Sequence, residues 1–458
     1  MPPLRFHDVQ RIRILDVSSK RNITIIGGGL AGPLLACLLA ENGNTVTIIE
    51  RRGDPRALGY EGGRSINLAL SARGLQALDR IGIKQAVLDT VVPMFGRMMH
   101  DEQRRTVYSP YSHVADEAIN SVSRGRLNCM VLDSAESMAG VTLAFNATCT
   151  DIDIESGTVR YDDEHGCSQV LEADLIVGAD GAGSIVRQAM DAIVPIDEGT
   201  DFISSGYKEL TIPAADDGSH RLERHALHIW PRGHYMMIAL PNSDGSFTCT
   251  CFWPMEGPES FSAVESPDSI RDFFAVHFPD AVPLMPDLVR EYTENPVGPL
   301  GTVRCRRYHH GSTAVLIGDA AHAIVPFFGQ GMNAAFQDCL RLAESIGGHD
   351  DLHDALVDYD RTQRPDGDAI GALSLTNFIE MRDKTASSTF LLLQRVRKQL
   401  GLWFPNLLMP RYNLVSFTTI PYARVLRIEA RQRILIPAIA LGVIACIALP
   451  ILWALDVI

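Results

Sequence analysis

The chain has 458 residues, 46% of them hydrophobic and 21% charged, which is enough to bury a large core and favours two domains. Its 41 basic and 55 acidic side chains give a formal net charge of −14, and this balance excludes the basic character typical of nucleic-acid-binding proteins. The nine cysteines are scattered and form no CxxC pair, so they indicate buried thiols in a reducing compartment and predict neither a disulfide framework nor a metal site.

The first predicted element is a strand–turn–helix–strand unit over residues 23–50. In its glycine turn, Gly27 permits the tight bend, Gly29 lets a pyrophosphate approach the backbone, and Gly32 allows the helix to pack close to the strand. Glu50 ends the second strand, where a carboxylate can accept hydrogen bonds from ribose hydroxyls. An ordinary glycine-rich turn would explain the glycines without the acid, so the combination predicts a dinucleotide site.

The next elements are typical of a divided α/β domain. Apolar runs over 141–146 and 173–178 predict buried parallel strands, and the polar stretch 151–171 between them predicts a β-meander. From residue 197 onward the pattern changes to short alternating segments joined by turns, which predict an antiparallel sheet. These strands are expected over 207–212, 226–230, 235–240 and 246–252. The chain then returns to the first domain through a strand that ends at Gly318 and a helix over 331–346.

Two later motifs bear on the same cofactor as the first glycine turn. The stretch 178–187 contains Asp180 within a Gly-Ala-Asp-Gly sequence. In the stretch 318–333, Asp319 ends a strand, where a carboxylate can bond ribityl hydroxyls. Residues 329–333 open a helix, whose backbone amides can face a pyrophosphate or a flavin carbonyl. The three motifs in this order are much more specific than any one of them.

These motifs resemble those of the single-component FAD-dependent aromatic hydroxylases, and the resemblance covers nearly the whole chain. Within that family, the stretches 63–70, 227–231, 237–242, 323–333, 377–381 and 410–417 are similar to members that act on the amino acid L-kynurenine. The resemblance implies FAD as cofactor, NADPH and O2 as co-substrates, and hydroxylation to 3-hydroxy-L-kynurenine through a flavin C4a-hydroperoxide. Another hydroxylase of the family, acting on a phenol, is the alternative, and a membrane-tethered flavoprotein without enzymatic activity is a second.

The resemblance also assigns residues to the two ligands. Besides Gly27, Gly29, Gly32 and Asp180 of the motifs, the expected FAD contacts are Ala31, Ile49, Glu50, Arg51, Arg52, Ala69, Arg124, Cys149, Asp319, Met332 and Asn333. The expected substrate contacts are Arg97, Tyr111, Asn377 and Tyr412, with Tyr108 as the competitor of Tyr111. An arginine can hold a carboxylate through two parallel hydrogen bonds, and tyrosine hydroxyls can add neutral ones. No catalytic side chain is expected, because the flavin performs the oxygen transfer, and His322 is expected to be structural or adjacent to the cofactor.

The last stretch, residues 434–455, carries no charge and follows Arg424, Arg427, Arg431 and Arg433. Its length predicts a transmembrane helix, and the basic flank favours a globular part that faces the cytosol. The membrane is then the mitochondrial outer membrane in a eukaryote or the cytoplasmic membrane in a bacterium. A buried core helix is the alternative, since Pro437 and Pro450 lie in the run.

The predicted fold class is therefore α/β: a Rossmann-like FAD-binding domain, an inserted antiparallel-sheet substrate domain, a C-terminal helical block and a C-terminal transmembrane helix. The FAD-binding domain is expected over 22–196, with substrate-domain strands near 95–112, and again over 301–350. The substrate domain is expected over 197–300, the helical block over 351–433 and the anchor over 434–455.

Overall fold

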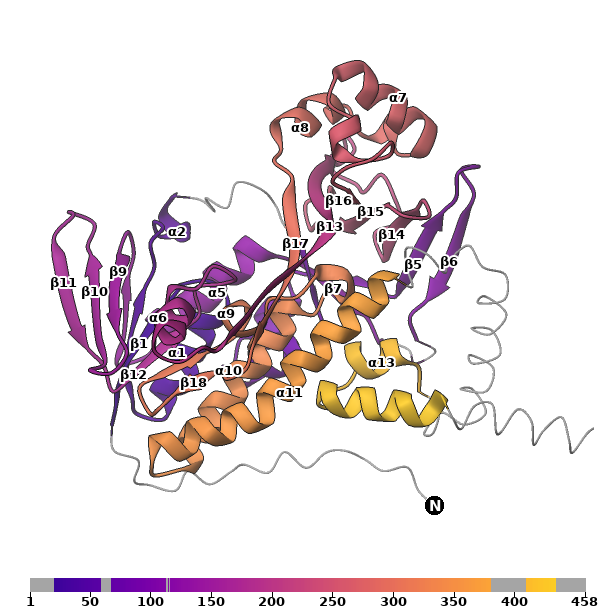
Figure 1. Cartoon of the computed structure of the whole chain (residues 1–458). Coiled ribbons are helices and arrows are strands. Elements are labelled where there is room, and N and C mark those ends of the chain that lie inside the picture. Colours follow the sequence, from indigo (N-terminus) through magenta and orange to yellow (C-terminus); the bar gives the residue numbers. More distant parts are fainter. Residues whose placement is uncertain (1–19, 59–66, 113, 115, 380–408, 434–458) are drawn as a thin grey trace, which may run out of the picture.

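The computed structural model describes residues 20–58, 67–112, 114, 116–379 and 409–433 (Figure 1). Its first layer is a six-stranded sheet in the order β18-β19-β12-β1-β2-β8. All neighbouring strands in it run parallel except β18 and β19. The strands are β1 (Asn22–Ile26), β2 (Thr45–Ile49), β8 (Val141–Ala144), β12 (Leu175–Gly178), β18 (His309–His310) and β19 (Ala314–Leu316). The parallel strands predicted near 141–146 and 173–178 are thus confirmed.

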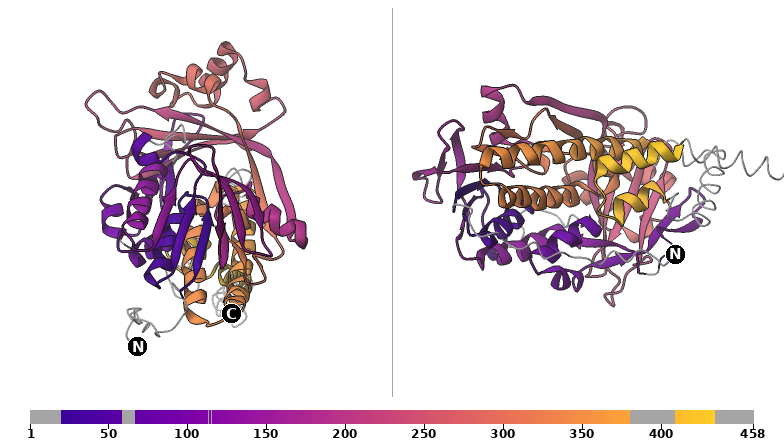
Figure 2. Two further views of the ribbon diagram at one scale, coloured as in Figure 1. Left: turned by 90° about the vertical axis from the view of Figure 1, so that its left-hand side faces the viewer. Right: turned by 90° about the horizontal axis from the view of Figure 1, so that it is seen from below.

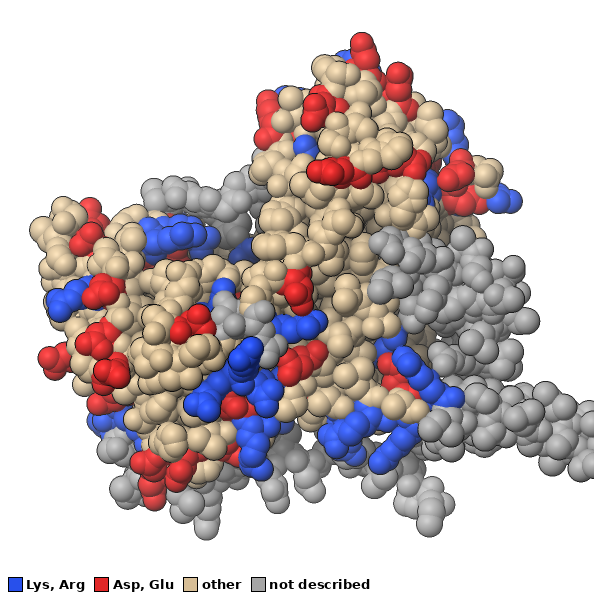
Figure 3. Space-filling model, in the orientation of Figure 1, with Lys and Arg blue, Asp and Glu red and all other residues tan. Residues whose placement is uncertain are grey.

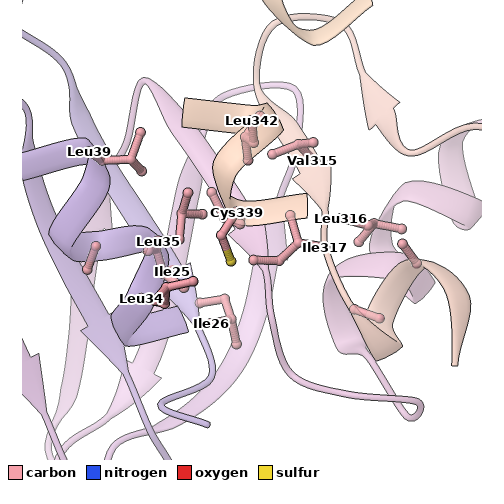
Figure 4. Close-up of a cluster of buried hydrophobic side chains, with 14 of the residues drawn as sticks. Ile25, Ile26, Leu34, Leu35, Leu39, Val315, Leu316, Ile317, Cys339 and Leu342 are labelled. Atoms are coloured by element: carbon pink, nitrogen blue, oxygen red, sulfur yellow. The ribbon is translucent and has the colours of Figure 1, made fainter. Parts of the chain in front are cut away.

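Apolar helices cover this sheet and form the main core. In α1 (Ala31–Glu41) every residue from Gly32 to Ala40 is buried, because the helix packs between the sheet and other helices. Figure 4 shows Leu35 of α1, Ile25 of β1 and Leu342 of α10 in the same cluster of buried side chains. The helices of this layer are α3 (Ala72–Arg80), α4 (Lys84–Leu88), α5 (Arg124–Glu136), α6 (Ile185–Ile193), α9 (Asp319–His322) and α10 (Gly331–Gly348), with α2 (Pro55–Leu58) beside them.

The second layer is a seven-stranded sheet in the order β17-β13-β16-β15-β14-β5-β6. Its strands are β5 (Gly96–His100), β6 (Thr106–Pro110), β13 (Asp197–Ile212), β14 (Ala226–Pro231), β15 (Met236–Pro241), β16 (Phe247–Pro254) and β17 (Gly298–Cys305). Neighbours are antiparallel except β14 and β5, which run parallel. The predicted antiparallel sheet is confirmed, with one difference: the strand expected over 207–212 begins at Asp197.

One face of this sheet is covered by η1 (Phe261–Ala263), α7 (Pro267–His277), η2 (Val282–Leu284) and α8 (Leu288–Glu294). Alternate residues of β16, among them Cys249, Cys251 and Trp253, point into this covered face, where Trp253 stacks on Phe278. Both cysteines are free and fully buried, as the sequence predicted for its thiols, whereas Cys129 and Cys149 are half-buried and Cys167 is exposed. On the face shown in Figure 3, acidic side chains gather at the outer end formed by α7 and α8.

Smaller elements complete the fold. The short strands β3 (Asn67–Leu70), β7 (Ile119–Ser123) and β4 (Val92–Met94) form one sheet, and β9 (Thr148–Asp153), β10 (Thr158–Asp162) and β11 (Ser168–Glu172) form the predicted meander. The 3-10 turn η3 (Pro326–Phe328) precedes α10, and α11 (Leu352–Ile379) packs beside α10. α13 (Arg411–Ser416) and the helical residues 422–433 follow, and Figure 2 shows this C-terminal part alongside α11.

The prediction of a C-terminal transmembrane helix is wrong on the evidence of the described residues. No helix there combines the length and the apolarity that crossing a bilayer requires. The stretch 434–455, for which the span was predicted, lies outside the described residues. We therefore correct the fold class to an FAD-binding α/β fold without that helix, and we withdraw the membrane partner and the membrane localisation. The division into domains stays a prediction, and β17 runs through its boundary at residue 300.

Candidate functional site

The glycine turn after β1 is built as the sequence predicted. Gly27 has φ +112°, and a Cβ on Gly32 would lie 2.1 Å from the Gly27 carbonyl oxygen, so both positions require glycine. A Cβ on Gly29 would meet nothing within 4 Å. The backbone at Gly29 therefore faces open space at the N-terminus of α1, where amide groups favour an anion.

Glu50 is tied to this turn by its own hydrogen bonds. Its Oε2 accepts from the Gly28 amide at 2.8 Å, and its Oε1 accepts from both the amide and the Nε of Arg52 at 2.9 Å. Burial alone would raise the pKa of Glu50, but the hydrogen bonds and charge of Arg52 more than offset it, so the pKa is lowered. The buried carboxylate thus stays ionised and fixes the glycine turn, a role that the sequence did not indicate.

The second motif places Asp180 at the end of β12, across from that turn. Its Oδ2 accepts from the Ile185 amide at 2.7 Å, whereas its Oδ1 is buried and has no hydrogen-bond partner among the described residues. Burial raises the pKa of Asp180. In the same motif Arg187, which is buried, donates to the Ala320 carbonyl at 2.8 Å and so links α6 to α9.

The third motif is held by a residue that we did not predict, Asp338 of α10. Its Oδ2 accepts from the Gly318 amide and from His322 Nε2, each at 2.7 Å, and its Oδ1 accepts from Gln363 Nε2 at 2.7 Å. His322 is therefore engaged in a buried ion pair, which agrees with a structural role. The sequence analysis found no signal for Asp338, because its three partners come from separate parts of the chain.

Asp319, next in this motif, carries no hydrogen bond from a described residue. The residue is exposed to solvent, yet protein atoms surround its carboxyl closely enough to raise the pKa, and the positive charges of His322 and Arg124 partly counteract this shift. Arg124 is the first residue of α5. The fold therefore brings Arg124 and Asp319, two of the predicted FAD contacts, close to each other. A Cβ on Gly331 would lie 4.0 Å from Asp319 Oδ1, which places the carboxylate beside the first turn of α10.

The side chain of Asn333 has a structural task. Its Nδ2 donates to the carbonyls of Ala69 and Gly329 at 2.8 and 2.9 Å, and its Oδ1 accepts from the Ser71 amide at 3.0 Å. Being fully buried, it joins β3 to the loop before α10. Any contact of Asn333 with a cofactor is therefore made through its backbone.

The remaining predicted FAD contacts lie around these three motifs. Ala31 begins α1, Ile49 and Arg51 stand at the end of β2, and Met332 lies partly buried in the first turn of α10. Cys149 is on β9, where burial raises the pKa of its thiol to about 12, so the thiol stays neutral. It lines a cavity of about 580 Å³ between β9 and α6, and none of the other predicted FAD-binding residues lines this cavity.

These groups fit a flavin dinucleotide. An open glycine backbone at a helix N-terminus suits a pyrophosphate, and the orphaned, buried Oδ1 of Asp180 and the free carboxylate of Asp319 are acceptors that lack hydroxyl donors. Ligand hydroxyls, such as those of a ribityl chain, would supply such donors.

A second cluster lies where β5, the residue after β6 and α13 meet. The Arg97 guanidinium carbon lies 4.4 Å from the ring centroid of Tyr412 and 5.3 Å from that of Tyr111. The cation is thus held against two aromatic rings. Arg97 Nε and the Tyr111 hydroxyl are buried and have no hydrogen-bond partner among the described residues. Burial raises the pKa of Tyr111 well above its usual value, so its hydroxyl remains a donor.

The structure separates the two candidate tyrosines. Tyr108 is 46% exposed and lies over Gly96, whose Cβ position would be 2.7 Å from the Tyr108 hydroxyl. Tyr111 is buried and faces Arg97. The geometry therefore favours Tyr111 as the residue that acts with Arg97.

Aromatic and amide groups complete this site, and we use the name Arg97 chamber for the cluster of the four side chains Arg97, Tyr111, Tyr412 and Phe328. Phe328 of η3 stacks on Tyr412 with centroids 5.7 Å apart. Asn377 of α11 donates from Nδ2 to the Phe327 carbonyl at 2.7 Å and so fixes η3. Since η3 leads directly into α10, the chamber adjoins the third cofactor motif.

Comparison with known proteins also indicates an FAD-binding protein. Residues 20–359 match the family described as FAD binding domain. A protein of Stenotrophomonas maltophilia named kynurenine 3-monooxygenase is 44% identical over 93% of both chains. Proteins of the same name from Myxococcus xanthus, 43% identical over 88% of this chain and 87% of that one, and Xanthomonas campestris, 45% identical over 92% of both, are also similar.

Solved structures share the fold. The tetrameric form of 2-methyl-3-hydroxypyridine-5-carboxylic acid oxygenase superposes with a TM-score of 0.64 at 23% identity, covering 81% of this chain and 95% of that one. Pseudomonas aeruginosa PqsL, solved in complex with 2-aminobenzoylacetate, gives 0.65 at 22% identity over 80% and 98% of the two chains. At these identities the likeness shows the architecture alone.

Proposed function

Because the chain belongs to the kynurenine 3-monooxygenase family of FAD-binding proteins, we propose that it hydroxylates L-kynurenine to 3-hydroxy-L-kynurenine, with FAD as cofactor and NADPH and O2 as co-substrates. The observation that carries the proposal within this structure is the Arg97 chamber. It offers a half-buried guanidinium whose Nε has no hydrogen-bond partner among the described residues, and the Tyr111 hydroxyl, which is buried and likewise unpartnered there, beside the cofactor motifs. An aromatic amino acid presents the complementary carboxylate and ring.

In this proposal Arg97 binds the substrate carboxylate, because a guanidinium can form two parallel charge-assisted hydrogen bonds with it. The Tyr111 hydroxyl donates a further one. Tyr412 stacks on Tyr111 and flanks the guanidinium, which limits the directions in which Arg97 can turn. Asn377 acts through η3, whose carbonyl it holds, and so shapes the wall between chamber and cofactor.

FAD would be held by the three motifs. The backbone of the glycine turn and the first turn of α1 would take the pyrophosphate, Glu50 the adenosine ribose, and Asp180 and Asp319 the hydroxyls of the chain between them. Arg124 lies close enough to Asp319 to affect its pKa and would face the same end of the cofactor. When bound, the flavin supplies the oxygen chemistry, and the protein orients the ring and excludes water.

The proposed reaction requires no side chain to act as a general acid or base. The ring of kynurenine is already enriched in electrons by its amino group, so no residue is needed to deprotonate a phenol. His322, the imidazole of the third motif, is paired with the buried Asp338 and is thereby committed to the loop.

The test is a reaction of the purified protein with L-kynurenine, NADPH and air, followed by product identification. We expect 3-hydroxy-L-kynurenine in proportion to the NADPH consumed. A protein that carries FAD but makes no such product would contradict the substrate assignment, and turnover of a phenol instead would favour the alternative hydroxylase.

A further inference from the structure

Two buried side chains of opposite charge hold the segment that carries Tyr412. Arg73 is on α3 and Asp366 is on α11, and both contact the chain between residues 415 and 423. Neither residue belongs to the cofactor motifs or to the Arg97 chamber. Because a buried charge is costly unless its hydrogen bonds are satisfied, the contacts of both groups indicate a specific task.

Arg73 is completely buried and binds carbonyl oxygens. Its Nε donates to the Val415 carbonyl at 3.1 Å, and a terminal nitrogen donates to the Ile420 carbonyl at 2.6 Å. The other terminal nitrogen donates to Gln337 Oε1 at 3.1 Å, which connects the guanidinium to α10. The guanidinium carbon also lies 3.9 Å from the ring centroid of Tyr422.

Asp366 binds a backbone amide of the same segment. Its Oδ1 accepts from the Ala423 amide at 2.9 Å, and the residue is buried. The guanidinium takes carbonyls and the carboxylate takes an amide, so the two charges bind complementary backbone groups. We call this pair, Arg73 and Asp366, the clamp.

The clamp binds α13, a helix that is too short to be stable without tertiary contacts. α13 has six residues, and isolated helices of that length are unstable in water because nucleation is unfavourable. Val415 lies in its last turn, where carbonyls have no intrahelical partner. The Arg73 guanidinium supplies that partner and places a positive charge at the C-terminal end of the helix.

The other end of α13 reaches the chamber. Tyr412, three residues before Val415, stacks on Tyr111 and lies over the Arg97 guanidinium. In addition, the Tyr422 hydroxyl donates to Gln330 Oε1 at 3.0 Å, in the residue before α10. The clamp therefore sets where α13 lies relative to the cofactor helices and to Arg97.

We propose that Arg73 and Asp366 are positioning residues for recognition of the substrate carboxylate, acting through α13 and Tyr412 on the orientation of Arg97. This inference rests on the proposed function, since it names how that site selects an amino acid. It predicts that loosening the clamp weakens the preference for a carboxylate-bearing substrate more than it weakens cofactor binding.

The experiment compares the wild type with Arg73→Met, Arg73→Lys and the control Val425→Ala. Val425 is fully buried in the same C-terminal cluster but makes no clamp contact, so its truncation lowers stability without touching the clamp. For each protein we would measure FAD content, Tm, and kcat/KM for L-kynurenine and for its decarboxylated amine analogue. The ratio of the two kcat/KM values reports carboxylate recognition and is insensitive to how much protein is folded.

For Arg73→Met we expect this ratio to fall about tenfold, as loss of a well-placed charge-assisted hydrogen bond would cause, with FAD retained. Arg73→Lys should recover part of the ratio, and Val425→Ala should keep the wild-type ratio despite a lower Tm. An unchanged ratio in Arg73→Met overturns the inference. If Arg73→Met does not fold, Arg73→Lys decides, and a wild-type ratio in that variant overturns it. A wild type that makes no 3-hydroxykynurenine overturns the function itself, and the inference with it.

Discussion

The rings of Tyr111 and Tyr412 lie stacked, with centroids 4.9 Å apart and planes inclined by 17°. Tyr111 follows β6 and Tyr412 belongs to α13, so the two walls of the Arg97 chamber come from distant parts of the chain. The chamber is complete only when the C-terminal helices are docked on the sheet, so the proposed binding of the substrate there would depend on the whole fold.

Arg97→Met should raise the KM for L-kynurenine while the protein keeps its FAD. Loss of a bidentate, charge-assisted contact costs about 2–4 kcal/mol, or roughly 30- to 700-fold. The measurement is steady-state kinetics beside the flavin absorption spectrum. Arg105→Ala on the same hairpin is the control, because Arg105 is exposed and pairs only locally with Asp101. Equal KM values for the two variants would remove Arg97 from the site.

Tyr111→Phe and Tyr108→Phe should differ. The Tyr111 hydroxyl is buried without a partner among the described residues, so its removal should leave stability unchanged but weaken kynurenine binding by about 1 kcal/mol. Tyr108 is partly exposed on β6, and its hydroxyl is expected to contribute nothing to binding. Substrate titrations of both variants decide this, and a larger loss in Tyr108→Phe would reverse the assignment.

Gly29→Ala and Gly32→Ala should separate cofactor binding from folding. A methyl group at Gly29 meets no protein atom, so thermal unfolding of the apoprotein should be unchanged while FAD affinity falls at least tenfold. A methyl group at Gly32 would strike the Gly27 carbonyl, and this variant should lose about 1–3 kcal/mol of stability. Flavin release on dilution and unfolding of the apoprotein give the two readouts. If Gly29→Ala binds FAD like the wild type, the pyrophosphate lies elsewhere.

Stability should fall as the pH drops below about 6.5, because of His228. Burial lowers the pKa of His228 from 6.5 to about 4. Its Nδ1 lies 2.9 Å from His100 Nε2, and its Nε2 lies 2.9 Å from the Glu223 carbonyl. A depressed pKa means that the unfolded state takes up the proton first, so its contribution is complete above pH 6.5 and is lost as pH falls toward 4. At about 1.4 kcal/mol per unit, the loss approaches roughly 3 kcal/mol.

Urea unfolding between pH 7 and pH 4 would show this loss in the wild type and a smaller one in His228→Gln. His165→Gln is the matched control, since His165 is exposed on the turn between β10 and β11. If the wild type and His228→Gln lost stability in parallel, another group would be responsible.

The features that could be predicted from the sequence are those that residues close together in the chain determine. Backbone geometry and period, which neighbouring residues specify, predict the glycine turn at Gly27, the end of β2 before Glu50 and the alternating strands of the second sheet. Asp319 was expected to end a strand, but β19 ends at Leu316 and Asp319 begins α9. The first half of β13 was missed because 197–206 lacks regular alternation, and its pairing with β17 shifts register twice.

The rest depends on contacts between distant residues. Asp338 and Arg73 are buried polar residues on helices, and no local pattern tells which carbonyl, amide or imidazole each will bind. The same holds for Glu50, whose bond to the Gly28 amide exists only once β2 lies beside β1. The C-terminal anchor was inferred from the uncharged run 434–455 and its basic flank, both of which are local features, without a contact between distant residues that could test it.

We propose that a flavin lies beside the Arg97 chamber and that the residues of this chamber bind an aromatic amino acid. The most direct measurement is quantification of 3-hydroxy-L-kynurenine formed by the FAD-loaded protein, against the NADPH it consumes. The account predicts about one product molecule per NADPH with L-kynurenine, and a large fall in that ratio with the decarboxylated analogue. Consumption of NADPH that yields hydrogen peroxide but no hydroxylated kynurenine would contradict it.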